Sequence, residues 1–129
     1  TVSEKEVIMM HDLKTAKLFE FCMVVPLILS GKNTPTREKE YRRYGKNFGL
    51  IFQATDDLLD YGGKKHITGK KTQKDLKKNK GSIMKHMTSI EVRGYCKNLA
   101  NSATIKINAF KDSENIFNKL IYKIIDRTS

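Results

Sequence analysis

Four side chains that can bind a cation share one face of a predicted helix. Gln53, Asp56, Asp57 and Asp60 follow the i, i+3, i+4, i+7 spacing that places residues side by side on a helix surface. Like charges at i, i+4 repel by about 0.2–0.5 kcal/mol, and the surrounding stretch is apolar, so a compensating cation is expected. Oxygen ligands on a rigid helix suit Mg²⁺, which completes its shell with water and substrate phosphates. The pattern therefore predicts a magnesium site.

A first helix over residues 1–31 precedes this acidic stripe. Ser3 followed by Glu6 is a capping-box pattern, and Lys14 and Thr15 fall in the middle of the helix. A threonine inside a helix is as often a solvated or back-bonding hydroxyl as a functional one, so Thr15 alone decides nothing. The residues expected on the apolar side of this helix are Val7, Ile8, Leu13, Leu18, Phe21 and Val25.

Three further segments complete the predicted architecture. A helix over residues 36–62 carries the acidic stripe and has apolar residues around most of its circumference, so it is expected to be buried on more than one face. Residues 63–83 form a lysine-rich loop, and residues 90–126 form the C-terminal helices. Because no alternating run of strand length competes with these helices, the sequence predicts an all-α fold in a single modest domain.

The net charge of the chain is compatible with nucleic-acid binding, but its residue types and motifs argue against that function. The formal net charge is +11, yet only five of the 25 basic residues are arginine, the side chain that recognises phosphates and guanines in a bidentate manner. No helix-turn-helix, zinc-finger or aromatic RNA-binding motif accompanies the charge. His11, His66 and His86 lack metal-ligand spacing and are interpreted as surface or structural residues.

The sequence also favours a cytoplasmic protein without a membrane span. Cys22 and Cys96 are far apart, without a CxxC pair or a secretory leader, so reduced thiols are expected. The longest apolar run, residues 18–29, is interrupted by Glu20 and Pro26 and is shorter than the ~20 residues that cross a bilayer. It is interpreted as a buried core helix, and no targeting segment is recognised.

Taken together, the motifs resemble the carboxy-terminal half of the trans-isoprenyl diphosphate synthases, or polyprenyl synthetases. The resemblance covers about residues 5–83 well and the remainder loosely. The residues that carry it, in chain order, are Lys14-Thr15, Tyr44-Gly45-x-x-x-Gly49-x-x-Phe52-Gln53-x-x-Asp56-Asp57-x-x-Asp60, Gly69-Lys70, Asp75-Leu76 and Lys80.

The resemblance implies four to five helices of the isoprenoid synthase bundle and a prenyltransferase activity. In such an enzyme Mg²⁺ and fixed ammonium groups stabilise the diphosphate of an allylic prenyl substrate as it leaves, and the double bond of isopentenyl diphosphate attacks the resulting cation. Carried over by position, Asp56 is the principal metal ligand, and Asp57 and Asp60 organise the shell around it. The same comparison assigns diphosphate binding to Lys14, Lys70 and Lys80, and stabilisation of the allylic cation to Thr15 and Gln53.

Several positions depart from the family pattern. The chain contains one DDxxD motif, whereas the family uses two, and Gln73 and Asn79 stand where glycines are usual. Without the family comparison, the lysines of residues 63–83 are equally consistent with a solvated basic loop. Two hypotheses follow. The chain is either the C-terminal portion of a prenyltransferase that works in a homo- or hetero-oligomer, with a separate N-terminal half supplying the other motif, or a non-catalytic small subunit or fragment that binds a partner or a diphosphate.

Overall fold

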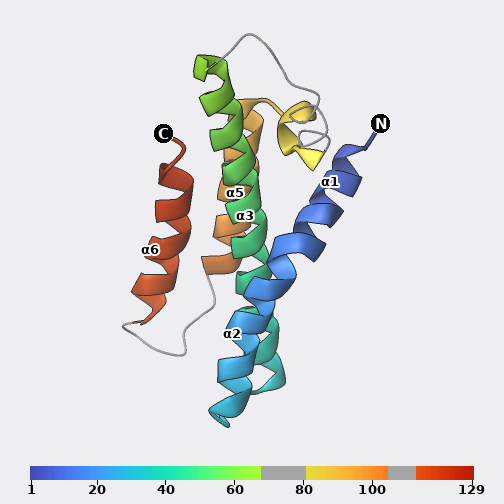
Figure 1. The fold of residues 1–129 in the computed structure, drawn as a ribbon. Coiled ribbons are helices and arrows are strands. Elements are labelled where there is room, and N and C mark those ends of the chain that lie inside the picture. The colour runs from blue at the N-terminus through green and yellow to red at the C-terminus, as the bar shows by residue number, and fades with distance from the viewer. Residues whose placement is uncertain (68–80, 105–112) are drawn as a thin grey trace.

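Regular structure is helical throughout the part of the chain that this computed structural model describes, residues 1–67, 81–104 and 113–129. The all-α prediction is confirmed. Figure 1 shows the elements in order along the chain. They are α1 (Glu4–His11), the π-helix η1 (Asp12–Ala16), α2 (Lys17–Leu29), α3 (Pro35–Ile67), the 3-10 helix η3 (Ile83–Lys85), α5 (Ser89–Thr104) and α6 (Ser113–Asp126).

The first predicted helix is present but is not α-helical throughout. The expected capping box forms, because the Ser3 side chain accepts from the Glu6 backbone N–H at 3.3 Å and the Glu6 carboxylate accepts from the Ser3 N–H at 2.8 Å. The Ser3 N–H and the Ser3 hydroxyl both donate to the Glu6 carboxylate, and these two hydrogen bonds lower the pKa of Glu6. The π-helix η1 then separates α1 from α2, and the chain turns after Leu29 at Gly31, whose φ is +70°. The predicted helix therefore consists of two α-helices joined by one wide turn.

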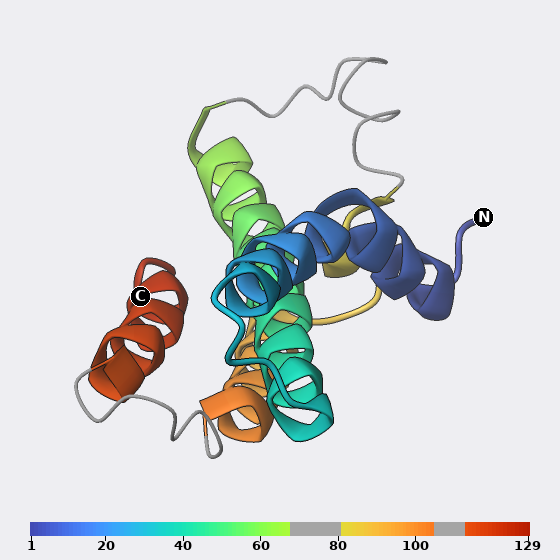
Figure 2. The ribbon, with the colours of Figure 1, turned by 90° about the horizontal axis from the view of Figure 1, so that it is seen from below.

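Helix α3 is the central element of the bundle, and it contacts α1, η1, α2, η3, α5 and α6. Figures 1 and 2 show α1 and α6 on opposite sides of it. Its approach to the preceding helices requires glycine at two positions: a Cβ on Gly45 would lie 2.6 Å from the Phe19 carbonyl oxygen, and one on Gly49 would lie 2.4 Å from the Ala16 Cα. The expected burial on several faces is confirmed, since neighbouring helices surround α3.

The predicted end of this helix at residue 62, and therefore the start of the basic loop at 63, is wrong. Helix α3 continues to Ile67. A glycine in a helix costs only about 1 kcal/mol relative to alanine, and Gly62 does not adopt the positive φ that would end the helix. Most of the loop, including residues 68–80, lies outside the described residues.

The C-terminal helices follow the prediction in part. Helix α5 begins at Ser89, where Thr88 and Glu91 form a second capping box, and this pairing lowers the pKa of Glu91. Helices α5 and α6 account for the C-terminal helices predicted over residues 90–126, while residues 105–112 between them lie outside the described residues. The Tyr44 hydroxyl of α3 donates to the Phe117 carbonyl of α6 at 2.7 Å, which fixes α6 against α3.

The apolar side predicted for the first helix is only partly buried. Val7 is fully buried, whereas Leu13, Leu18 and Phe21 are 65, 63 and 62% exposed. The interpretation of residues 18–29 as a buried core helix is therefore wrong for much of that helix, because α2 packs against α3 through one face only. None of the helices in the described part of the chain is both long and apolar enough to span a bilayer.

Candidate functional site

Thr15 and Gln53, 38 residues apart in the sequence, meet between η1 and α3. The Thr15 hydroxyl donates to the Gln53 side-chain oxygen at 3.0 Å. Thr15 lies within η1, where the Lys17 N–H bonds to the Asp12 carbonyl in place of the usual i–4 partner. Single π-turns inside α-helices occur frequently at functional sites, where they redirect side chains. The structure thus brings together two of the predicted site residues at a local irregularity of the backbone.

The same network continues from Gln53 to Asp57. The Gln53 amide nitrogen donates to Asp57 Oδ1 at 3.2 Å. The other carboxylate oxygen, Oδ2, accepts from the Ile83 backbone N–H at 2.9 Å and lies 3.1 Å from His11 Nε2. His11 is only 3% exposed, so the interpretation of this histidine as structural fits and the surface alternative is excluded. We refer to His11, Gln53, Asp57 and Ile83 as the Asp57 cluster.

Asp56 has a different environment from its neighbour in sequence. Its side chain is 48% exposed, and its Oδ1 lies 3.8 Å from Arg127 Nη2. The Arg127 guanidinium also donates to the Thr55 hydroxyl at 2.7 Å and stacks over the Phe52 ring at 4.8 Å. Sequence reasoning assigned no role to Arg127, although arginine is scarce in this lysine-rich chain, and that scarcity is the one feature that singles it out. The guanidinium places a positive charge near Asp56.

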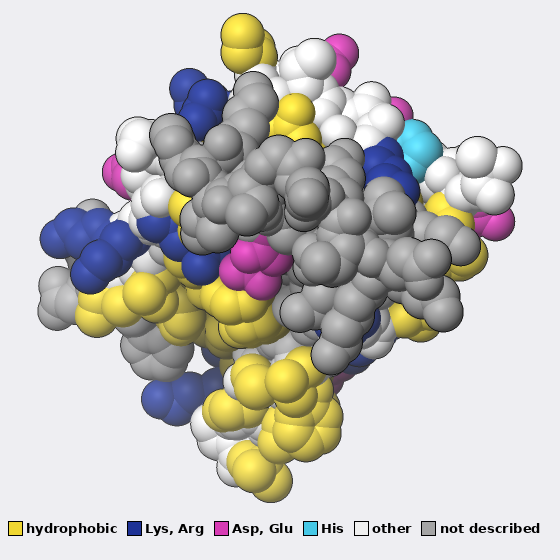
Figure 3. Space-filling view, turned by 45° about the horizontal axis from the view of Figure 1, so that its top comes forward, with side chains coloured by type: hydrophobic (Ala, Val, Ile, Leu, Met, Phe, Trp, Pro, Cys, Tyr) yellow, Lys and Arg dark blue, Asp and Glu magenta, His cyan; other side chains and the backbone are white. Residues whose placement is uncertain are grey.

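The remaining predicted residues divide between the surface and the undescribed loop. Asp60 and Lys14 are exposed, and neither has a hydrogen bond or ion pair to another described residue. Lys70 and Lys80, predicted to bind diphosphate, lie outside the described residues. Figure 3 shows acidic side chains close to Lys and Arg side chains and to hydrophobic surface at this end of the molecule. The site is thus a buried polar network beside exposed carboxylates.

The accessible carboxylates of the acidic stripe supply only part of a metal shell and suit a metal ion that is also bound by a diphosphate. Among the described residues, no three His, Cys, Asp or Glu side chains gather closely enough to hold an ion on their own. Mg²⁺ is commonly held by one or two carboxylates together with water and substrate phosphates. Asp56 and Asp60, one helical turn apart and both accessible, provide that kind of ligand set. The donors therefore fit a Mg²⁺–diphosphate better than bare Mg²⁺.

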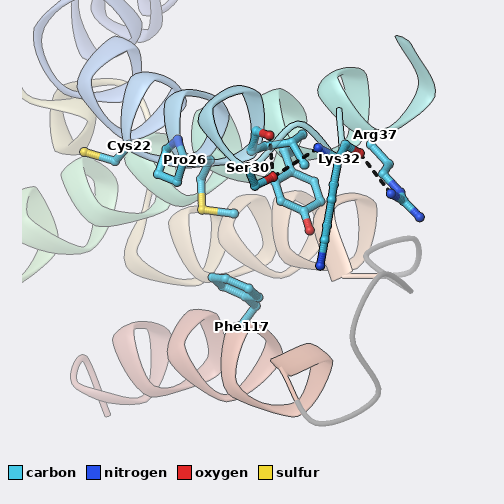
Figure 4. Close-up of a pocket in the computed structure, with 9 residues that line it drawn as sticks. Cys22, Pro26, Ser30, Lys32, Arg37 and Phe117 are labelled. Atoms are coloured by element: carbon cyan, nitrogen blue, oxygen red, sulfur yellow. Dashed lines mark hydrogen bonds between the residues drawn. The ribbon is translucent and has the colours of Figure 1, made fainter. Parts of the chain in front are cut away.

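A cavity of about 640 Å³ lies away from the acidic stripe, between α2, the start of α3 and α6. Figure 4 shows Phe117 of α6 facing Cys22 and Pro26 of α2 across it. Its polar groups are engaged locally: Ser30 donates to the Leu27 carbonyl at 2.7 Å, and Arg37 donates to the Lys32 carbonyl at 2.9 Å. No aspartate or glutamate is among its described lining residues, so this cavity is separate from the candidate site.

Comparison with known protein families assigns the chain to one of them. The model of the family described as "Polyprenyl synthetase" matches residues 1–120. The chain belongs to this family. The match includes the Lys14-Thr15 pair and the whole acidic stripe, and it confirms the resemblance recognised from those motifs. Membership in the polyprenyl synthetase family also agrees with the all-α structure.

The relatives that the chain matches are named for different prenyl diphosphate products or substrates. The chain is 44% identical over 66 residues to a probable mitochondrial hexaprenyl pyrophosphate synthase of Yarrowia lipolytica, covering 50% of this chain and 14% of the relative. It is 41% identical over 70 residues to octaprenyl diphosphate synthase of Escherichia coli, covering 54 and 21%. It is 32% identical over 118 residues to a dimethylallyltranstransferase of Fischerella ambigua, covering 92 and 34%.

Coverage limits what these relatives say about the chain. The chain spans between 14 and 34% of the length of the three relatives named above. No solved structure matches it. The comparisons therefore establish a prenyl diphosphate synthase family, while the substrates, the metal and the assembly belong to the proposal below.

Proposed function

We propose that the chain takes part in condensing isopentenyl diphosphate with an allylic prenyl diphosphate, with Mg²⁺ as cofactor and in the cytoplasm. The observation that carries the proposal is the contact of Thr15 with Gln53 next to the exposed Asp56. The Lys14-Thr15 pair lies in η1 and the acidic stripe lies in α3, and the hydrogen bond from Thr15 to Gln53 joins them near the middle of α3. The named relatives, which include hexaprenyl and octaprenyl synthases, support the same chemistry.

The accessible residues would bind the diphosphate. Asp56 and Asp60 would hold Mg²⁺, which neutralises the negative charge that grows on a leaving diphosphate. Lys14 is proposed to contact the diphosphate oxygens directly, together with Lys70 and Lys80. An ammonium group is suited to this task because it is a compact charge with three rotatable donors.

Thr15 and Gln53 would act on the hydrocarbon end of the substrate. The Thr15 hydroxyl donates a hydrogen bond to Gln53. Its oxygen lone pairs are therefore directed away from that bond and can face a developing allylic cation. Oriented dipoles of this kind stabilise charge without reorganising during the reaction. The double bond of isopentenyl diphosphate would then attack this cation to form the new carbon–carbon bond, and loss of a proton to the released diphosphate would restore a double bond.

A second candidate function is supported by the single DDxxD motif in the chain. One acidic helix does not supply the two that this family places around the metal ions, so the chain would bind diphosphate or a partner without turnover. The catalytic proposal accordingly includes an oligomer in which another subunit, or a separate N-terminal half, supplies the first motif.

Binding is tested by the melting temperature of the purified chain with Mg²⁺ and inorganic pyrophosphate. At a ligand concentration 100 times Kd, a ligand specific for the folded state adds about 2.7 kcal/mol of stability, so the melting temperature should rise by several degrees. Asp56→Ala should abolish the rise, whereas Glu40→Ala, which removes a carboxylate elsewhere on α3, should preserve it. A rise that survives Asp56→Ala contradicts a metal role for this residue.

Turnover is tested with labelled isopentenyl diphosphate and allylic primers of several lengths. The chain is assayed alone and mixed with an N-terminal half that contains the other acidic motif. Elongated product in the mixture supports the catalytic proposal. Pyrophosphate binding without product in either assay favours the non-catalytic alternative.

A further inference from the structure

His11 is buried although its ring lacks hydrogen-bond partners in the described part of the chain. The residue is 3% exposed, and neither ring nitrogen has an aligned hydrogen bond to another described residue. The polar group that it approaches is Asp57, whose Oδ2 lies 3.1 Å from Nε2. A buried polar group without a partner costs roughly 1–3 kcal/mol, so an apolar side chain would suit simple core packing better. The carboxylate contact is therefore the feature that favours histidine at this position.

Both oxygens of Asp57 are occupied by the protein. Oδ1 accepts from Gln53, and Oδ2 accepts from the Ile83 N–H and faces His11. The Asp57 side chain is only 12% exposed, against 48% for Asp56. With donors at each oxygen and little access to solvent, Asp57 is poorly placed to bind a metal ion directly.

Asp57 also fixes which way the Gln53 amide points. Because the amide nitrogen donates to Asp57, the amide oxygen faces the other way and accepts from Thr15. A flipped amide would place its nitrogen against the Thr15 hydroxyl and its oxygen against the carboxylate, where two acceptors would repel. The orientation of the Thr15 hydroxyl thus depends on Asp57 through Gln53.

We infer that His11 is a positioning residue that keeps Asp57 turned into the protein, and so orients Gln53 and Thr15 while leaving Asp56 and Asp60 to meet a Mg²⁺–diphosphate. The inference rests on the proposed function for the identity of the ligand. The arrangement of the Asp57 cluster stands on the contacts alone. His11 acts through Asp57 and touches no substrate.

The experiment compares His11→Leu with His11→Gln. Leucine keeps an apolar volume, and the glutamine amide nitrogen can replace Nε2 as a donor. Two quantities are measured: the affinity for Mg²⁺ with inorganic pyrophosphate by calorimetry, and the hydrogen-exchange rate of the Ile83 amide by NMR. In His11→Leu we expect the affinity for Mg²⁺ with pyrophosphate to fall by about tenfold, as for other residues that orient a metal-binding side chain without touching the metal. We also expect faster hydrogen exchange at the Ile83 amide. His11→Gln should restore both quantities.

A folded His11→Leu protein with the affinity and the Ile83 exchange rate of the original chain overturns the inference. If the original chain binds no pyrophosphate, the proposed function fails, and the Ile83 exchange rates alone decide the role of His11. If His11→Leu does not fold, the original chain provides the test through nitrogen-15 shifts of the ring. A proton on Nε2 is expected, and a ring protonated only on Nδ1 overturns the inference because two acceptors would then face each other.

Discussion

Two adjacent aspartates in the acidic stripe have opposite environments. One step along an α-helix turns a side chain by about 100°, which is enough here to place Asp57 in the interior and Asp56 at the surface. Asp57 accepts hydrogen bonds from Gln53 and Ile83 and lies against the His11 ring. Asp56 instead faces solvent and the Arg127 guanidinium. The same side-chain type is therefore suited to organising the protein at one position and to meeting a ligand at the next.

At the same scale, Cys96 predicts how stability depends on alkaline pH. Burial raises the pKa of its thiol from 9.0 to about 11, so the folded protein retains a proton that the unfolded chain releases. The free energy of unfolding should therefore be unaffected by this group below about pH 9 and should fall as the pH rises toward 11. Urea unfolding at a series of pH values measures this decrease.

The matched control is Cys96→Ala, which lacks the thiol. Its stability should decrease less steeply over the same pH range, although Tyr95, whose pKa is raised by burial to about 12, still contributes at the alkaline end. Identical slopes for the two proteins would contradict a buried, protonated thiol. Cys22 is exposed and free, so it offers a second comparison: it should react with a thiol reagent in the folded protein, while Cys96 should not.

Residue types and spacing predicted which side chains could do chemistry, but not their contacts. Thr15 and Gln53 were each predicted as site residues, and the structure adds the hydrogen bond between them. His11 and Arg127 were given no functional role because each meets the acidic stripe only through tertiary packing, 46 and 71 positions away from its partner in the sequence. Pairings at such distances leave no local pattern.

The helical elements pack most closely where α3 crosses the N-terminal helices. Gly49 lies against the Ala16 backbone, and Gly45 lies against the backbone of Phe19 and Glu20. Removing two Cβ atoms from α3 at successive turns lets the helix backbones approach each other directly. This close crossing also determines the separation of Thr15 from Gln53, one turn further along α3.

Glycine substitutions test this crossing. Gly49→Ala would place a Cβ 2.4 Å from the Ala16 Cα, and backbone atoms cannot yield as a flexible side chain can. We expect a loss of about 2–4 kcal/mol in the free energy of unfolding, measured by urea denaturation, as for other overpacked positions. The control is Gly62→Ala in the same helix, where no atom lies within 4 Å, and this change should stabilise the protein by about 0.5–1 kcal/mol. Equal effects at both positions would contradict the close crossing.

Local patterns predicted the helices well and their boundaries less well. The capping box at Ser3 depends on residues three apart and was predicted from the sequence. The one at Thr88 has the same spacing but was not predicted. The π-helix η1 is not visible in the sequence, because a single wide turn depends on how the helix packs against α3. The end of α3 was misplaced for a related reason: glycine pairs often end helices, but here Gly62 keeps a helical backbone.

For the molecule as a whole, the notable property is an exposed apolar surface on the N-terminal helices. Its members, each between 45 and 81% exposed, are Met9, Met10, Leu13, Leu18, Phe21, Ile28 and Leu29. Large contiguous apolar surfaces on soluble proteins mark contacts with other surfaces.

We therefore expect the purified chain to self-associate. Sedimentation velocity across a range of micromolar concentrations should show species larger than the 14.8 kDa monomer. The double variant Leu18→Ser with Phe21→Ser should shift the distribution toward monomer, whereas Ile90→Ser, at a still more exposed apolar position at the start of α5, should not. A single monomeric boundary for the original chain at all concentrations would contradict the expectation.

The π-helix has one more consequence. Its extra residue acts as a one-residue insertion in the helical register, and a register shift of one residue corresponds to a rotation of about 100°. With this insertion, α1 directs Val7 and His11 toward the protein interior while α2 keeps its own buried face, Val24 and Leu27, against the rest of the bundle. Deleting one residue from Asp12–Ala16 would rotate these two faces relative to each other. The spacing between Ser3 and Lys17 is therefore as much a requirement of the site as the identity of the residues within it.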